Sequence, residues 1–228
     1  LIFLGFTVSE SIAQYEIYRP NHDDLTYYFG ITLGYNSSTL RATKRNRFLA
    51  SDSILSAEAS ASNGIVLGLL GTARLSDHFQ IRINPQLVLG GSRSFTYVLG
   101  SKQPNESEIQ KKILPSTLAS LPIHIKFNSD RIRNFRMYVL GGARFDMDLS
   151  SNAAARNAED LIKLEKYNTS VETGIGFNFF LPFVTISPEL KFSYGITNVH
   201  ARDDGLKYSN VFDKIRTSMF TFSLHFED

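Results

Sequence analysis

Apolar and polar side chains alternate through eight separate segments of this 228-residue chain. In residues 29–36, one alternate set is Phe, Ile, Leu and Tyr, and the other is Gly, Thr, Gly and Asn. This two-residue period predicts a β-strand, because successive side chains of a strand point to opposite faces. The eight segments span residues 29–36, 64–74, 79–89, 120–127, 135–148, 167–179, 184–196 and 220–226. Eight strands are enough to close a single barrel.

The connections between these segments differ in length. Three are short, at 76–78, 128–134 and 181–183, and four are long, at 41–61, 99–115, 150–165 and 199–213. Bacterial outer-membrane barrels combine short periplasmic turns with long extracellular loops. We therefore predict an all-β chain that forms an eight-stranded antiparallel up-and-down transmembrane β-barrel. It would lie in the bacterial outer membrane, with four longer extracellular loops and both termini in the periplasm.

Glycine positions indicate which face of the strands is inside. A soluble barrel of the lipocalin type is apolar inside, whereas a membrane barrel is apolar outside. Most strand glycines share the polar face, where a crowded lumen needs small residues and a solvated surface does not. The apolar face carries Phe, Leu, Ile and Val with almost no charge, as contact with lipid requires. Phe and Tyr also gather toward both strand ends, like the aromatic girdles of membrane barrels. We therefore predict that the polar face lines the lumen.

Charges of both signs lie on this predicted inner face. They are Arg74, Arg82, Lys126, Arg136, Arg144, Asp146, Asp148, Glu172, Glu189 and Lys191. Charges can line a channel, but eight strands enclose room only for side chains or one small ligand. Bulky residues on the same face, such as Tyr28, Tyr138 and Phe180, would help to fill that room. We therefore predict a structural salt-bridge network in the lumen rather than a pore.

The N-terminal residues have the character of the end of a secretory signal peptide. Residues 1–8 are mainly apolar, and Ser11 and Ala13 are small residues of the kind that precede a cleavage site. A buried N-terminal strand is the alternative. No later stretch approaches the run of about 20 apolar residues that a membrane helix needs. We predict a signal-peptide remnant at 1–13, a periplasmic lead-in at 14–26 and the barrel at 27–228.

The sequence contains no recognisable motif for catalysis, metal binding or cofactor binding. It has no Cys, and its five His residues lack the spacing of metal ligands. His200, Asp203 and Ser209 could be combined into a hydrolase site in one loop, but a solvated loop is the simpler interpretation. A net charge of +2 offers no basic field for nucleic acid. We expect no enzymatic activity, no cofactor and no small-molecule substrate, with outer-membrane lipid as the surroundings.

Several stretches resemble the PorT family of outer-membrane barrels from Bacteroidetes. They are LPIHIKF at 121–127, MYVLGGA at 137–143, SPELKFSYGI at 187–196, KIRTSMF at 214–220 and SLHFE at 223–227. The resemblance extends over most of the chain after the predicted signal peptide. It implies a non-enzymatic component of the type IX protein secretion system, which also supports gliding motility in some bacteria. It further implies that other components of that system are partners, and it supplies no catalytic residues.

Two other functions are compatible with the same barrel. One is a generic structural or adhesive barrel whose loops at 41–61 and 99–115 bind a ligand outside the cell. The other is a barrel enzyme that acts on lipid, which would need a loop residue such as His200. Because a filled eight-stranded barrel cannot pass a folded protein, we expect the function to reside in the rims, the loops or the lipid-facing wall.

Overall fold

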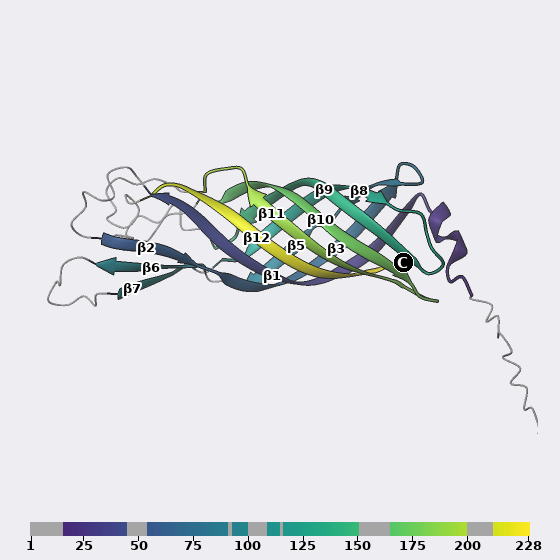
Figure 1. The fold of residues 1–228 in the computed structure, drawn as a ribbon, viewed down its shortest axis with the longest axis horizontal. Coiled ribbons are helices and arrows are strands. Elements are labelled where there is room, and N and C mark those ends of the chain that lie inside the picture. The colour runs from purple at the N-terminus through teal and green to yellow at the C-terminus, as the bar shows by residue number, and fades with distance from the viewer. Residues whose placement is uncertain are drawn as a thin grey trace, which may run out of the picture.

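The computed structural model describes residues 16–44, 54–90, 93–99, 109–114, 116–150, 165–199 and 212–228. These residues lie mostly in β-strands, with one short 3-10 helix, η1, at Pro20–Asp24 (Figure 1). No helix among them is long and apolar enough to cross a membrane. The predicted signal-peptide remnant at 1–13 lies outside the described residues.

Eight antiparallel wall segments, which we call staves, close one barrel. Each stave is one strand, or two strands in line, that spans the wall. Seven of them are β1 (Tyr27–Lys44), β3 (Ser62–Arg74), β8 (Leu118–Asn128), β9 (Phe135–Asp148), β10 (Tyr167–Phe180), β11 (Thr185–Gly195) and β12 (Phe212–Glu227). The eighth consists of β4 (Phe79–Ile83) and β5 (Gln86–Gly90). The staves pair in chain order, and β1 closes the ring by pairing with both β3 and β12. The predicted barrel is confirmed.

The two ends of the barrel differ. The three predicted short turns connect β3 to β4, β8 to β9 and β10 to β11, and we call this end the turn end. Helix η1 and the C-terminus lie there, on the right in Figure 1. The opposite end, where the longer connections begin, is called the loop end.

The third predicted strand is divided into β4 and β5 at Pro85. Proline has no N–H for a ladder hydrogen bond, so it interrupts a strand locally. On the β4 side, Ile83 pairs with Ile123 of β8. On the β5 side, Gln86 pairs with Ser120, which keeps the same register. The two strands therefore remain one stave with a break in its hydrogen bonding.

A second sheet extends from the loop end (Figure 1). It consists of β2 (Ile54–Ser60), β6 (Arg93–Leu99) and β7 (Ile109–Leu114), in the order β2-β6-β7. Parts of the loops predicted at 41–61 and 99–115 are thus strands, and β12 begins inside the loop predicted at 199–213. Ladder hydrogen bonds involve only the backbone, so paired strands can continue beyond the region where side chains alternate. The side-chain pattern therefore predicted the strands shorter than they are.

The polar face of the strands lines the lumen, and the apolar face is outside. In β8, His124 and Lys126 are at most 1% exposed, whereas Ile125 and Phe127 are 57% and 44% exposed. Exposed large apolar side chains occur on all eight staves. Such a surface suits hydrocarbon, which offers no hydrogen bonds to polar groups. The prediction that the polar face is inside is confirmed.

Candidate functional site

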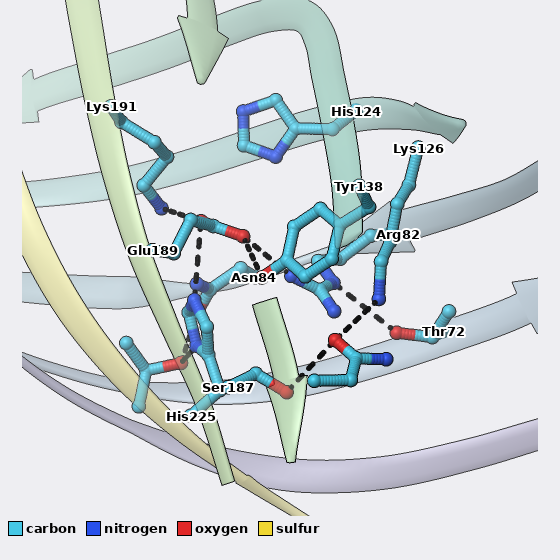
Figure 2. Close-up of polar contacts among 12 residues, drawn as sticks. Thr72, Arg82, Asn84, His124, Lys126, Tyr138, Ser187, Glu189, Lys191 and His225 are labelled. Atoms are coloured by element: carbon cyan, nitrogen blue, oxygen red, sulfur yellow. Dashed lines mark hydrogen bonds and ion pairs between the residues drawn. The ribbon is translucent and has the colours of Figure 1, made fainter. Parts of the chain in front are cut away.

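The lumen contains a network of buried charges, and Arg82 of β4 lies within it (Figure 2). Its Nη1 donates to Oε2 of Glu189 at 2.8 Å, and its Nη2 donates to Oε1 of Glu227 at 2.8 Å. All three side chains are at most 1% exposed. Strand β4 shares no ladder with β11 or β12, which carry the two carboxylates. Arg82 therefore connects staves across the interior of the barrel.

Several side chains converge on the carboxylate of Glu189 (Figure 2). The hydroxyl of Tyr138 donates to it at 2.7 Å, and Nζ of Lys191 lies 3.1 Å away. Nε2 of His225 is also 3.1 Å away, and Nδ1 of the same ring lies 2.9 Å from the hydroxyl of Thr32. These contacts join β9, β11 and β12 at one carboxylate, and His225 extends them to β1. The Glu189 carboxylate therefore connects several strands through the interior.

The buried ammonium group of Lys126 is stabilised in a different way. Its Nζ lies 3.9 Å from the centroid of the Tyr138 ring and donates to Oδ1 of Asn178 at 3.4 Å. The same Asn178 oxygen accepts a hydrogen bond from Ser187 at 3.2 Å. The face of an aromatic ring attracts a cation, most strongly where water is excluded. Tyr138 therefore compensates two buried charges, with its ring for Lys126 and its hydroxyl for Glu189.

A second charge cluster lies nearer the loop end, around Arg144 of β9. Its Nε donates to Oδ1 of Asp146 at 2.7 Å, and its Nη2 donates to the hydroxyl of Ser120 at 3.0 Å. Nη1 of the same residue lies 3.7 Å from Oε1 of Glu172. Nε2 of His124 lies 2.9 Å from the other Glu172 oxygen. This cluster joins β8, β9 and β10.

Buried acids and bases balance among the described residues. Besides the buried histidines His22, His124 and His225, five are Lys or Arg, namely Arg82, Lys126, Arg136, Arg144 and Lys191, and five are Asp or Glu, namely Asp146, Asp148, Glu172, Glu189 and Glu227. An unpaired buried charge is costly, whereas paired and hydrogen-bonded charges offset much of their desolvation. Pores that select ions by charged side chains carry rings of one sign. The lumen instead has the composition of a salt-bridged core.

Nine of the ten residues that the sequence predicted for the lumen are buried inside the barrel. Arg74 is the exception, because it is the last residue of β3 and its side chain lies at the turn end. There its Nη2 pairs with Asp77 at 2.5 Å and stays partly exposed. Glu227 is missing from the predicted set, although it continues the polar series of Ser223 and His225. The same two-residue period would have identified it.

Two glycines make room for this packed interior. A Cβ at Gly176 would lie 2.3 Å from Cζ of Tyr138, the residue that pairs with it in β9. A Cβ at Gly142 would lie 2.0 Å from the carbonyl oxygen of Ile123 in β8. Glycine lowers strand stability, so it commonly marks close approach of this kind. The Tyr138 ring can lie across the lumen because Gly176 has no side chain.

The segment before β1 lies across the turn end of the barrel (Figure 1). Nη1 of Arg19 donates to the hydroxyl of Thr185 and to the carbonyl of Glu227, both at 3.1 Å. The N–H of Tyr18 donates to Oδ1 of Asn134 at 2.9 Å. These contacts reach β11 and β12 on one side and the start of β9 on the other. Residues 16–25 therefore span the mouth of the barrel.

Ion pairs of Asp23 fasten this segment. Its carboxylate lies 2.8 Å from Nη2 of Arg136 and 3.3 Å from Nη1 of Arg131. Arg131 also donates to the carbonyl of Tyr18, and its guanidinium lies 3.7 Å from the centroid of Phe180. Arg131 and Arg136 thus hold the segment in place.

His22 is buried under the same segment. Its ring centroid lies 4.9 Å from that of Tyr28 and 5.4 Å from that of Phe180. Burial, together with the positive charge of Arg19, lowers the pKa of His22 from 6.5 to about 4. The ring is therefore neutral at pH 7, as suits a position between two aromatic rings.

Toward the loop end, the lumen is filled by apolar side chains. Val66, Val88, Leu118 and Met219 form a buried cluster there. A small hollow beside Asp146 and Asn168 has a volume of about 10 Å³, which is room for roughly one water molecule. Apolar side chains and paired charges thus occupy much of the described interior.

The described part of the chain contains no group of three or more His, Asp or Glu side chains that could hold a metal ion. The loop residues His200, Asp203 and Ser209 lie outside the described residues.

An eight-stranded barrel with an apolar exterior and a charge-paired interior defines a small membrane barrel. The chain belongs to the family described as outer membrane protein beta-barrel domain, which matches residues 13–201. Its location is accordingly the outer membrane. No curated protein matches the sequence.

The chain is also similar to several solved outer-membrane proteins. Neisserial surface protein A is 10% identical, with a TM-score of 0.45 over 86% of this chain and 95% of that one. OprG from Pseudomonas aeruginosa is 14% identical, with a TM-score of 0.43 over 88% and 92% of the two chains. The attachment invasion locus protein Ail of Yersinia pestis, in complex with the heparin analogue sucrose octasulfate, is 12% identical, with a TM-score of 0.41 over 90% and 100%. At these identities the likeness says nothing of function.

Proposed function

We propose that this barrel is a non-enzymatic outer-membrane component required for protein secretion, in the type IX system or in the assembly of that machinery. The observation that carries the proposal is the filled lumen. Because balanced charges, apolar side chains and the N-terminal segment occupy it, the barrel has no room for a transported protein. Its contribution to secretion would come from its outer surfaces.

The resemblance to PorT barrels supports this proposal at specific places. The similar stretches fall on β8, β9, β11 and β12. They contain Glu189 and Glu227, which pair with Arg82. They also contain Tyr138 and His225, which contact Glu189, and Lys126, which lies over the Tyr138 ring. The resemblance therefore concerns the charge network as well as the general strand pattern. We propose that this network keeps the barrel rigid while its surfaces contact partners.

The proposal includes an orientation in the membrane. Short turns face the periplasm in bacterial outer-membrane barrels. The turn end would then present residues 16–25 and both termini to the periplasm, together with Arg131 and its neighbours. Other secretion components in the periplasm could contact this end. The sheet of β2, β6 and β7 would extend outside the cell.

Deletion of the gene tests the proposed function. We expect type IX cargo to disappear from the culture medium while the amounts of other outer-membrane barrels stay normal. Complementation with the wild-type gene should restore export. Normal cargo export in the deletion strain would reject the role in secretion.

A generic structural or adhesive barrel is the second candidate, and the sheet beyond the loop end favours it. Among the described strands, β2 and β7 each have one unpaired edge in that sheet. An unpaired edge can accept an extended peptide from another protein. Replacement of residues 93–114 by a short turn should then abolish binding to an external ligand and leave secretion unchanged. Loss of secretion in that variant would favour the first candidate.

A further inference from the structure

The lipid-facing wall has a hollow near the loop end, across β3, β5, β8 and β9. Its volume is about 740 Å³. Side chains that point out of the barrel provide most of its lining, including Leu67, Leu87, Leu121 and Phe145. The hollow is therefore open to the membrane, and Gln86, Ser120 and Asp146, whose side chains are buried, complete its lining.

One row of paired residues explains this hollow. From stave to stave the row consists of Leu67, Leu87, Ala119, Met147 and Tyr167. Ala119 is the small member, with Leu87 on one side and Met147 on the other. Directly opposite side chains on one face of a sheet are close neighbours. A single alanine between two long side chains therefore leaves a notch in the wall.

The next row toward the turn end deepens the notch. There Pro85 lies between Leu69, whose N–H donates to its carbonyl at 2.9 Å, and Leu121. The compact proline ring is diagonal to Ala119. The small side chains of Ala119 and Pro85 are adjacent and flanked by leucines, so together they form a groove.

A positive charge lies at the loop end of this groove. Tyr167, which lines it, is the first residue of β10, and Lys166 immediately precedes Tyr167. Nζ of Lys166 lies 5.8 Å from the centroid of the Tyr167 ring, and its side chain is exposed. The groove therefore runs from apolar residues in the wall to a cation at the membrane surface, where lipid headgroups lie.

We propose that this groove binds one acyl chain of an anionic lipid of the outer leaflet, with a phosphate of its headgroup at Lys166. The chain would lie over Ala119 and Pro85. Lipid tails are as apolar as leucine side chains, so hydrophobicity alone does not favour the groove over bulk lipid. Binding would instead depend on the fit of the chain in the groove and on the headgroup charge. This site is independent of the proposed role in secretion.

Three variants test the site. Ala119→Phe places a ring in the notch, and Ala119→Leu does so with a smaller side chain. Ala143→Phe is the matched control, because Ala143 pairs with Ile123, two rows nearer the turn end, and does not line the hollow. Lys166→Gln removes the charge and leaves the groove open.

Native mass spectrometry of the purified barrel from detergent micelles measures the result. The probes are two model lipids with identical acyl chains, phosphatidylglycerol, which is anionic, and phosphatidylcholine, which is zwitterionic. The wild type and Ala143→Phe should retain one phosphatidylglycerol molecule, and both Ala119 variants should lose it. Lys166→Gln should lower the preference for phosphatidylglycerol over phosphatidylcholine by about fivefold, as expected for one lysine near an anionic headgroup.

Two outcomes would overturn the proposal. One is lipid retention in both Ala119 variants equal to that of the wild type. The other is a change of association state in these variants, measured by light scattering, with lipid retention intact. That second result would mean that the groove is a contact between protein chains. Heat-dependent gel mobility checks that each variant is folded. If Ala119→Phe does not fold, Ala119→Leu alone tests the groove.

Discussion

Arg82 and Glu189 form an ion pair across the interior of the barrel, with 2.8 Å between Nη1 and Oε2 and at most 1% exposure of either side chain. They belong to β4 and β11, which share no ladder. The pair therefore supports the barrel through its interior rather than around its wall. Charged side chains thus fill this part of the interior, where a soluble protein would bury apolar ones. Each charge needs a partner, because an isolated buried charge is costly.

Removal of the central cation should destabilise the barrel strongly. Arg82→Met leaves the carboxylates of Glu189 and Glu227 without their guanidinium partner. We expect a loss of about 3–5 kcal/mol in the free energy of unfolding, as for other broken buried pairs. Urea unfolding in phospholipid vesicles, followed by circular dichroism, measures it. The further changes Glu189→Gln and Glu227→Gln should restore part of the loss.

Arg74→Met provides the matched control for that experiment. Arg74 also pairs with a carboxylate, but its partner Asp77 is 81% exposed at the turn end. Exposed pairs contribute about 0–1 kcal/mol, so this variant should unfold almost like the wild type. Equal losses in the two arginine variants would show that burial of the charge network is not what matters.

Position 176, beside the Tyr138 ring, should tolerate only glycine. Gly176→Ala places a Cβ against the Tyr138 ring, and overpacking of this kind typically costs about 1–3 kcal/mol. In a Tyr138→Ala background the same substitution should cost less, because the ring is gone. Gly141→Ala is the control, since its nearest contact would be the carbonyl of Glu172 at 4.0 Å. A similar cost with and without the ring would contradict the packing described for Gly176.

Docking of the N-terminal segment should weaken in acid. The pKa of His22 is about 4 in the folded protein and 6.5 when the residue is free. Between these pH values the undocked segment binds a proton that the docked one does not, so docking is strongest above pH 6.5 and weakens toward pH 4. Hydrogen exchange of residues 16–25, corrected for intrinsic rates, should therefore accelerate over this range. His22→Phe should remove the dependence, and its persistence in that variant would assign it to another group.

The purified barrel should not conduct ions. In planar bilayers we expect no stable single-channel current, because charges, apolar residues and the N-terminal segment fill the lumen. A variant without residues 16–25 should also remain closed, since the salt bridges and the apolar cluster of Val66 and Val88 persist. A steady current in the wild type would contradict the sealed interior.

The barrel itself follows from the sequence because lipid and a narrow lumen impose opposite demands on alternate residues. That alternation locates all eight staves and the inward direction of residues such as Lys126 and Glu189. It does not reveal the break at Pro85, which changes hydrogen bonding without changing the side-chain pattern. Nor does it reveal β2, β6 and β7, because these strands extend beyond the barrel.

The individual partners in the lumen could not be predicted from the sequence. The pairing of Arg82 with Glu227 joins residues 145 positions apart, and it depends on how the closed barrel brings non-adjacent strands face to face. The contacts of Arg19 and Asp23 with the barrel have no periodic signal at all. The sequence therefore indicates which residues lie inside, whereas the three-dimensional closure determines which of them meet.

Fluorescence of single tryptophans in vesicles with brominated acyl chains tests most directly which face of the strands meets the lipid. The chain has no Trp, so Phe222→Trp reports on a position that is 48% exposed, and Phe180→Trp reports on one that is 1% exposed. We predict strong quenching by bromine at position 222 and little at position 180. Strong quenching at position 180 with little at 222 would mean that the faces are reversed, and the charge-filled interior could not then exist.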